Sequence, residues 1–529
     1  MTERAGRSET QIQNDLCPTG VLGLDNILRG GLTRNRLYLL EGDPGAGKTT
    51  LALQFLLEGA RRGERGLYVP LSENKEELLG VADSHGWSLD EIDLIELSAI
   101  EHQLQAESEN TFFHPSEVEL NRITQILLAE IDRLKPSRVV FDSLSELRLM
   151  SETALRYRRQ VLRLKQFFTG KQCTVLVLDD RAARESRDLQ VQSLAHGVIS
   201  MEHSSPDYGV TRRYLNIVKI RGRSYREGFH DFVIQKGGLV VFPRPEATVQ
   251  SDSSRGEPFT SGIPALDTLL GGGLHRGTSN MFMGPPGTGK STLSIKHAVE
   301  AARRGERVNV YLFDETLGTL LGRAKALGMD LEPHMESGTL RIEVVDPAEI
   351  SPGELTFRIR QAVENENVRM VVIDSLNGYM NAMPEERYLS LQLHELLAYL
   401  NQHGVLTIMV LAQQGVVNLQ QSSIELTYLA DTVVLLRFFE AHGAVKQAIS
   451  IIKKRSGNHE RTLREFLIDE TGIHIGEPLR NFQGVMQGVP EYIGNGDSGT
   501  QLRSEQLSHK GDERGASARK NARRRTHRE

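Results

Sequence analysis

The sequence predicts an α/β protein built from two tandem domains, each with a mostly parallel central sheet covered by helices on both faces. Three observations support this prediction. A glycine-rich phosphate-binding loop occurs twice, further residues repeat at a constant offset, and apolar strands alternate with amphipathic helices in both halves. The chain has 529 residues, so each half is long enough to bury a full hydrophobic core.

Two segments, 42–50 and 284–292, match the phosphate-binding loop G-x-x-x-x-G-K-[ST]. Each follows a short apolar strand and precedes a helix, which is the context that the motif requires. Glycines let the backbone N–H groups point at phosphate oxygens, and the helix start adds a partial positive charge. The lysine should reach the β- and γ-phosphates of ATP, and the hydroxyl after it should ligate Mg²⁺. The predicted nucleotide-binding residues are Gly42, Gly45, Gly47, Lys48, Thr49, Thr50, Gly284, Gly287, Thr288, Gly289, Lys290, Ser291 and Thr292.

The second half of the chain repeats the first. Lys48 and Lys290 are 242 positions apart (290 − 48), and the same offset relates Asp25 to Asp267 and Glu73 to Glu315. Matches in one frame indicate a duplicated domain. The expected organisation is a flexible N-terminus at 1–16, a first domain at 17–247, a linker at 248–258, a second domain at 259–490 and a disordered basic tail at 491–529.

Composition indicates a globular protein without a membrane segment. No apolar run approaches the roughly 20 residues that span a bilayer, and the polar N-terminus has no signal core. The net charge of −6 gives no overall bias toward nucleic acid or anionic membrane. The two cysteines imply no disulfide framework, and the histidines show no zinc-ligand spacing. We therefore expect a cytoplasmic protein with no membrane or nucleic-acid partner.

Acidic residues are predicted at the carboxyl ends of the strands, where α/β folds bind ligands. Asp142 and Asp374 each end an apolar strand and should hold Mg²⁺ through water. Glu73, Asp314 and Glu315 follow neighbouring strands and are candidate general bases for water or a hydroxyl group. The alternative is that these last acids only stabilise the start of a helix.

A basic pattern recurs late in each half. Lys219 and Arg221 follow one apolar strand, and Lys453 and Arg455 follow its counterpart. In these positions, fixed cations could neutralise the charge that builds on the γ-phosphate. The alternative interpretation is that the residues belong to a basic hairpin exposed to solvent. The basic segment 519–525 in the tail is better interpreted as a solvated disordered end than as a contact for nucleic acid or an acidic partner.

These features together resemble the KaiC family of circadian clock proteins, within the RecA-like phosphate-loop ATPases. The resemblance covers about residues 17–485. It rests on both phosphate loops and on motifs at Gly20, Leu24-Asp25, 30–32, Gly262, Leu266-Asp267, 272–274, 313–316, Asp374-Ser375, 431–436 and 463–466. It implies a homohexamer of two stacked rings with ATP between subunits, where Lys219 and Arg221, or Lys453 and Arg455, come from the neighbour. It also implies ATP and Mg²⁺ as cofactors, and Kai-type or signalling proteins as partners.

The resemblance further implies an ATPase that phosphorylates itself as a serine/threonine kinase, in signalling or circadian-type timing. The family's acceptors are an adjacent Ser-Thr pair, and Thr427-Tyr428 stands there, which makes Thr427 the candidate acceptor. The family's two consecutive glutamates are replaced by Ser72-Glu73 and Asp314-Glu315. Two other functions stay open. One is a RecA-like DNA-dependent ATPase, although no zinc-binding cysteine pairs or helical DNA-binding module are present. The other is a nucleotide-gated scaffold with little turnover.

Overall fold

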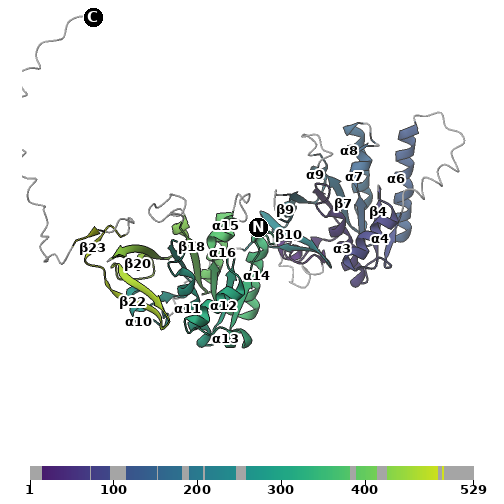
Figure 1. Ribbon diagram of the computed structural model, residues 1–529. Helices are drawn as coiled ribbons and strands as arrows, with labels where there is room; N and C mark the ends of the chain where they lie inside the picture. Colours follow the sequence, from purple (N-terminus) through teal and green to yellow (C-terminus); the bar gives the residue numbers. More distant parts are fainter. Residues whose placement is uncertain are drawn as a thin grey trace, which may run out of the picture.

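The computed structural model has two lobes, one for each half of the chain (Figure 1). It describes residues 15–71, 73–95, 115–149, 151, 153–181, 190–205, 209–245, 258–381, 389–413, 426–441, 443–485 and 491–493. Each lobe is built on a nine-stranded sheet. Within the described ranges, no helix is both long and apolar enough to cross a membrane.

The first sheet has the strand order β11-β10-β9-β8-β3-β7-β6-β4-β5. Its parallel part comprises β3 (Leu37–Gly42), β4 (Gly66–Pro70), β5 (Ile92–Leu94), β6 (Arg138–Asp142), β7 (Thr174–Asp180) and β8 (Gly197–Ser204). Its antiparallel extension comprises β9 (Arg212–Ile220), β10 (Phe229–Gln235) and β11 (Gly238–Phe242). The main helices are α3 (Lys48–Arg61), α4 (Lys75–His85), α6 (Pro115–Leu134), α7 (Leu144–Leu149), α8 (Ala154–Phe168) and α9 (Gln190–Leu194). Shorter pieces are β1 (Leu16–Cys17), α2 (Leu24–Ile27) and β2 (Leu32–Thr33).

The second sheet repeats this order as β16-β15-β17-β18-β14-β19-β20-β21-β22. Its strands are β14 (Ser279–Gly284), β15 (Arg307–Leu312), β16 (Leu340–Val344), β17 (Val368–Asp374), β18 (Leu406–Ala412), β19 (Thr432–Ala441), β20 (Ala444–Lys454), β21 (Arg464–Asp469) and β22 (Gly472–Pro478). Its helices are α10 (Pro264–Leu269), α11 (Lys290–Arg303), α12 (Leu317–Ala326), α13 (Glu332–Glu336), α14 (Pro352–Glu366), α15 (Leu376–Asn381), α16 (Leu389–Gln402) and the short 3₁₀ helix η1 (Leu426–Leu429).

Helices cover both faces of each sheet, so the parallel strands are buried on both sides. Along β3, Tyr38 and Leu40 pack in one core with α3, while Leu37 and Leu39 pack in a second core with α6 and α8. Alternate strand side chains therefore pack against the helices on the two opposite faces of the sheet, as the apolar strands of the sequence predict. All the carboxyl ends of the parallel strands therefore meet at one edge of the sheet.

The structure extends the second domain beyond two of the expected boundaries. Pro258, expected as the last linker residue, pairs with His275 between β12 (Pro258–Phe259) and β13 (Leu274–His275). Residues expected as the start of the tail form β24 (Glu491–Tyr492), which pairs with β23 (Phe482–Gln483). Backbone pairing places both short strands in ordered structure, which the polar composition of these stretches did not indicate.

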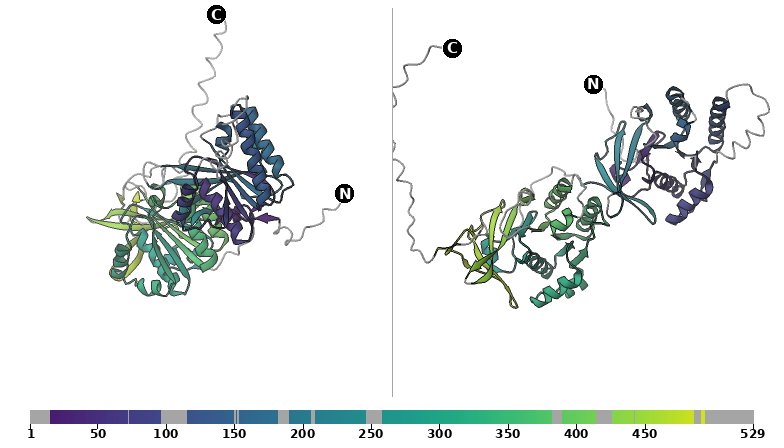
Figure 2. Two further views of the ribbon diagram at one scale, coloured as in Figure 1. Left: turned by 90° about the vertical axis from the view of Figure 1, so that its right-hand side faces the viewer. Right: turned by 45° about the horizontal axis from the view of Figure 1, so that its top comes forward.

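The two lobes meet where β10 and β11 of the first domain lie beside α14 of the second (Figures 1 and 2). The backbone N–H of Gly353, in the first turn of α14, donates to the Asp231 carboxylate at 2.8 Å. The rings of Phe242 and Phe357 pack with centroids 5.4 Å apart. This contact joins the antiparallel extension of the first sheet to a helix that packs on the second.

Candidate functional site

Both phosphate loops lie at the carboxyl edges of their sheets, after β3 and β14. Gly47 and Gly289 precede α3 and α11 with φ angles of 94° and 91°, in the left-handed region that favours glycine. A Cβ atom would lie 2.5 Å from Ile234 Cδ1 at Gly47 and 2.5 Å from Ile468 Cδ1 at Gly289. The positive φ favours glycine at both positions, and an added Cβ would force the isoleucine side chain to shift. The N–H groups of the first helical turn that follows have no intrahelical partner.

The two loop lysines are buried and differ in their partners. Lys48 Nζ donates to the carbonyls of Gly42 and Asp43 and lies 2.8 Å from Asp180 Oδ1. Lys290 Nζ donates to the Pro285 carbonyl at 2.7 Å. Burial lowers the pKa of Lys290 to about 8, although the charge of Asp374 opposes this shift. A phosphate group beside either lysine would supply the strong anionic partner that a buried ammonium group favours.

A hydroxyl and a carboxylate meet beside each loop. Thr49 Oγ1 donates to Asp142 Oδ2 at 3.1 Å, and Tyr68 donates to the same oxygen at 2.5 Å. Burial raises the pKa of Asp142, and these two hydrogen bonds oppose the shift. In the second domain, burial raises the pKa of Asp374 to about 6 against a hydrogen bond from Ser291. Asp374 Oδ2 is buried and has no hydrogen-bond partner among the described residues.

This donor set fits Mg²⁺ bound together with a nucleotide. Magnesium prefers oxygen ligands and keeps several waters, so a hydroxyl and one nearby carboxylate suffice when phosphates supply the rest. Across the described ranges, no group of three or more His, Cys, Asp or Glu residues could hold a metal ion by itself, without phosphate ligands. A bound cation, or a water molecule on that cation, would supply the missing partner of Asp374 Oδ2.

The candidate bases have different surroundings in the two domains. Burial raises the pKa of Glu73 to about 7, and the charge of Asp142 adds to the shift. Glu73 Oε2 is buried, and no hydrogen-bond partner for it is found in the part of the chain that the structure describes. In contrast, Glu315 Oε2 lies 2.9 Å from Arg323 Nη2 on α12. Asp314 accepts a hydrogen bond from the Ser375 hydroxyl. Ser72, the residue equivalent to Asp314, lies outside the described residues.

Sequence reasoning missed three residues at these sites: Tyr68, Asp180 and Arg323. The Asp179-Asp180 pair at the end of an apolar strand was a signal for Asp180. In the second sheet Ala412 occupies the place of Asp180, because Gly42 pairs with Asp180 and Gly284 pairs with Ala412. Nothing in the pattern identified Arg323, whose counterpart at the repeat offset is Val81 (323 − 81 = 242).

The structure does not bring the four predicted cations to the phosphate loop of their own domain. Lys219 pairs with Val198, and Arg221 N donates to the His196 carbonyl, both beside the start of β3. Lys453 and Arg455 lie in the same way beside the start of β14. The phosphate loops follow the far ends of these strands, about 17 Å away at roughly 3.3 Å per residue. These cations therefore lie too far from the phosphate loop of their own domain to contact a nucleotide bound there.

Thr427 lies on η1 at the same amino-terminal edge as these cations. Lys453 Nζ donates to the backbone carbonyls of Thr427 at 2.9 Å and Ala430 at 2.7 Å. Arg455 Nη2 donates to the Tyr428 carbonyl at 3.3 Å. Thr427 is half-buried and the side chain of Tyr428 is exposed. The candidate acceptor and the second pair of cations thus form one local group.

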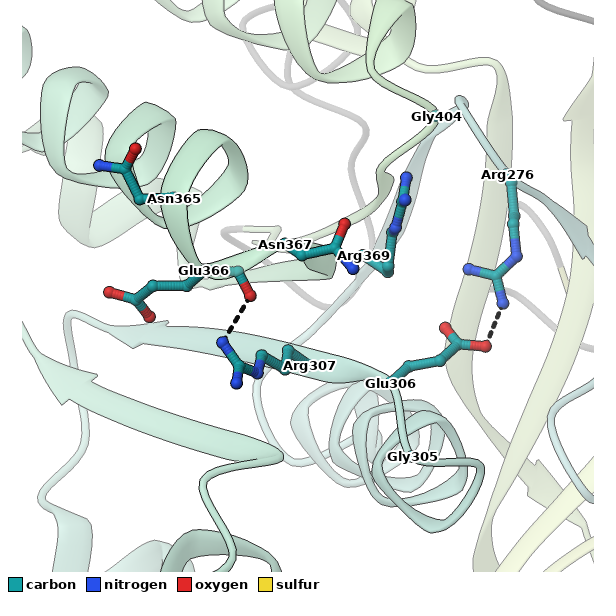
Figure 3. A pocket seen from close by; sticks show the side chains of 9 residues that line it. All are labelled: Arg276, Gly305, Glu306, Arg307, Asn365, Glu366, Asn367, Arg369 and Gly404. Carbon is teal, nitrogen blue, oxygen red and sulfur yellow. Dashed lines mark hydrogen bonds and ion pairs between the residues drawn. The ribbon is translucent and has the colours of Figure 1, made fainter.

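A cavity of about 650 Å³ also lies at the amino-terminal edge of the second sheet (Figure 3). Arg276 forms an ion pair with Glu306 there, and Arg307 Nη1 donates to the Glu366 carbonyl at 2.8 Å. The first domain has the equivalent ion pair between Arg34 and Glu64 at 2.7 Å. The cavity contains none of the predicted site residues, and its repeated ion pair indicates a structural role.

The duplicated fold and its two phosphate loops define a tandem phosphate-loop ATPase. The model of the family described as "ATPase: KaiC" matches residues 17–246 and 259–480. The chain therefore belongs to the KaiC family of ATPases, and the family relationship implies nucleotide binding.

Curated relatives carry the same family name. The chain is 27% identical over 492 residues to circadian clock protein KaiC2 of Synechocystis sp., covering 92% of this chain and 84% of the relative. It is 26% identical to circadian clock protein KaiC3 of the same organism, covering 90% and 94%. It is also 26% identical to the circadian clock oscillator protein KaiC of Thermosynechococcus vestitus, covering 90% and 92%.

Proposed function

We propose that both domains bind ATP with Mg²⁺ and hydrolyse it, and that the second domain also phosphorylates Thr427. The observation that carries this proposal is the repeated grouping of a buried lysine, a hydroxyl–carboxylate pair and a nearby acid at the carboxyl edge of each sheet. Lys48 and Lys290 hold the β- and γ-phosphates, together with the amides of their loops. Bound Mg²⁺ would neutralise phosphate charge, held by Thr49 and Asp142 or by Ser291 and Asp374.

In hydrolysis, a water oxygen forms a bond to the γ-phosphorus, and the bond from that phosphorus to the bridging oxygen breaks. The bridging electrons leave with ADP. Glu73 in the first domain accepts the proton of the attacking water, for which a pKa of about 7 suits neutral pH. Glu315, with Asp314 beside it, takes this role in the second domain.

In self-phosphorylation, the Thr427 hydroxyl oxygen takes the place of water. Its oxygen forms the bond to the γ-phosphorus, the bond to the bridging oxygen breaks, and the proton passes to Glu315 of the subunit that holds the ATP. Thr427 and the second phosphate loop lie at opposite edges of the sheet, which supports transfer between subunits rather than within one.

This arrangement supports a closed homo-oligomer, which we take to be a hexamer of two stacked rings. The neighbour supplies Lys219 and Arg221 to the first site, and Lys453 and Arg455 to the second. An arginine placed in trans is worth on the order of 10³–10⁵ in rate. The relatives named as circadian clock proteins support a role in signalling or timing. We propose that this role is cytoplasmic and that Kai-type or signalling proteins are the partners.

The test is intact mass and phosphopeptide mapping after incubation with Mg-ATP. Wild type should gain one phosphate at Thr427, while Lys290→Ala and Thr427→Ala should gain none. Tyr428→Phe, the matched control at the next residue, should still be phosphorylated. A mixture of Lys290→Ala and Thr427→Ala should regain phosphate on the Lys290→Ala chain, because transfer occurs between subunits. ATP consumption without any phosphate on wild type would refute the kinase and leave an ATPase.

A further inference from the structure

A group of basic side chains gathers at the amino-terminal edge of the first sheet. This first-edge cluster consists of Arg36, Lys165, His196, Lys219 and Arg221. Arg36 precedes β3, Lys165 lies near the end of α8, and His196 precedes β8. These three residues and Arg221 line one cavity of about 130 Å³. Lys219 lies two residues before Arg221 on β9, so the predicted trans cations belong to a larger basic surface.

The charges of this cluster are not balanced. In the part of the chain that the structure describes, none of its lysines or arginines forms an ion pair with a carboxylate. Arg36 Nη1 donates to the Asn35 carbonyl at 3.0 Å, and Arg221 Nη2 donates to the Ser193 carbonyl at 2.7 Å. His196 Nε2 is buried and has no hydrogen-bond partner within the described ranges. Burial and the surrounding cations lower the pKa of His196 and of Lys219.

The same edge of the second domain is different. Asp431 occupies the position equivalent to His196. The His196 carbonyl accepts the backbone N–H of Arg221, and the Asp431 carbonyl accepts the backbone N–H of Arg455. The Asp431 carboxylate lies 3.6 Å from Arg455 Nη1. Thr278 replaces Arg36 at the repeat offset (278 − 36 = 242). The two sheets share their strand order, but the arginine at this edge has a carboxylate partner in the second domain, and none is found for Arg221 among the described residues.

Crowded like charges are costly unless an anion joins them. A cavity of about 130 Å³ has room for a phosphate group, whereas pockets for drug-sized ligands usually measure about 300–1,000 Å³. Arginine at this edge suits phosphate oxygens, which it can bind through paired N–H groups.

We infer that Arg36 and Lys165 join Lys219 and Arg221 in binding the phosphates of the nucleotide held by the first phosphate loop of an adjacent copy of this chain. The inference rests on the proposed function and adds two residues from outside the recurring basic pattern. They contact substrate on the neighbouring subunit, so their loss should weaken the first site without altering the fold of the subunit that carries them.

The first experiment uses the full chain with Lys290→Ala, which leaves only the first site active. In this background, Arg36→Gln with Lys165→Gln should weaken ATP binding and lower kcat/KM by about tenfold or more, as expected for lost charge-assisted hydrogen bonds. Arg159→Gln is the matched control, because Arg159 is an exposed arginine on the same helix, α8. It should leave both values unchanged. All three proteins should unfold at the same temperature.

The second experiment tests whether the residues act in trans. Chains with Lys48→Ala lack the first phosphate loop, and chains with Arg36→Gln and Lys165→Gln lack the cluster, all in the Lys290→Ala background. In a random equal mixture, about a quarter of the interfaces pair an intact loop with an intact cluster, so activity should exceed the mean of the two proteins measured separately. Loss of activity without recovery on mixing would overturn the inference, as would full activity of the double variant. If the Lys290→Ala chain itself consumes no ATP, the proposed function fails instead.

Discussion

Lys48 Nζ lies 2.8 Å from Asp180 Oδ1, whereas Ala412 occupies the place of Asp180 beside Lys290. A carboxylate at the end of β7 therefore lies where it would compete with phosphate for the lysine of the first loop. Asp180→Ala should tighten ATP binding at the first site by roughly three- to tenfold, because it removes a partly exposed ion pair and a negative charge. Titration with a fluorescent ATP analogue in the Lys290→Ala background measures this. Unchanged or weaker binding would show that Asp180 does not compete.

The activity of the first site should depend on the ionisation of Glu73. Burial and the charge of Asp142 raise its pKa to about 7, and a general base must be deprotonated to accept a proton. The ATPase rate of Lys290→Ala should therefore rise with pH through about 7 and level off above it. Glu73→Gln should lower the rate by about 10²–10⁴ and remove this rise. A rising limb that persists in Glu73→Gln would assign it to another group.

Arg323 should hold Glu315 in place for the second site. Arg323→Gln breaks the 2.9 Å ion pair, so the carboxylate gains rotational freedom and the second-site kcat should fall by about tenfold with little change in KM. Arg323→Lys should recover part of the rate. The control is Lys325→Gln, an exposed lysine on the same helix. Rates are measured in the Lys48→Ala background, and an equal loss in both variants would point to a general effect on α12.

Gly289→Ala should destabilise the second domain. The new Cβ would lie 2.5 Å from Ile468 Cδ1, and the residue would keep a φ of 91° that alanine disfavours. Clash and backbone strain together should cost about 2–4 kcal/mol and weaken nucleotide binding. Gly305→Ala isolates the strain, because Gly305 has a φ of 78° but no atom within 4 Å of the added Cβ. Urea unfolding should show a smaller loss for Gly305→Ala, and equal losses would mean that the clash is relieved.

The parallel sheets and the phosphate loops could be predicted because they depend on local patterns. Apolar strands and the lysine motif fix the order of elements within a short stretch of chain. Helix starts are harder to predict. Helix α3 begins at Lys48, before its first apolar residue Leu51, and α8 begins at Ala154, after a cap by Thr153. Polar residues in a first turn hide the apolar period on which the prediction depends.

Contacts between distant strands could not be predicted in this way. The ion pair of Lys48 with Asp180 requires β3 and β7 to be neighbouring strands in a particular register. A local sequence pattern does not predict which strands are neighbours. The ion pair of Glu315 with Arg323 depends on side-chain direction along α12. The antiparallel pairing of β9 with β8 carries Arg221 back to the start of the sheet, so its distance from its own loop appears only in three dimensions.

The opposite placement of the phosphate loop and the cations has a consequence for how activity depends on protein concentration. If each site needs the loop of one subunit and the cations of the next, an open linear assembly leaves one terminal site incomplete among the first domains and one among the second domains. Closing the assembly completes that last site without any new contact type. Specific activity should then fall on dilution and rise on closure. The rate of ATP turnover per subunit would then indicate how far the protein has assembled into closed rings.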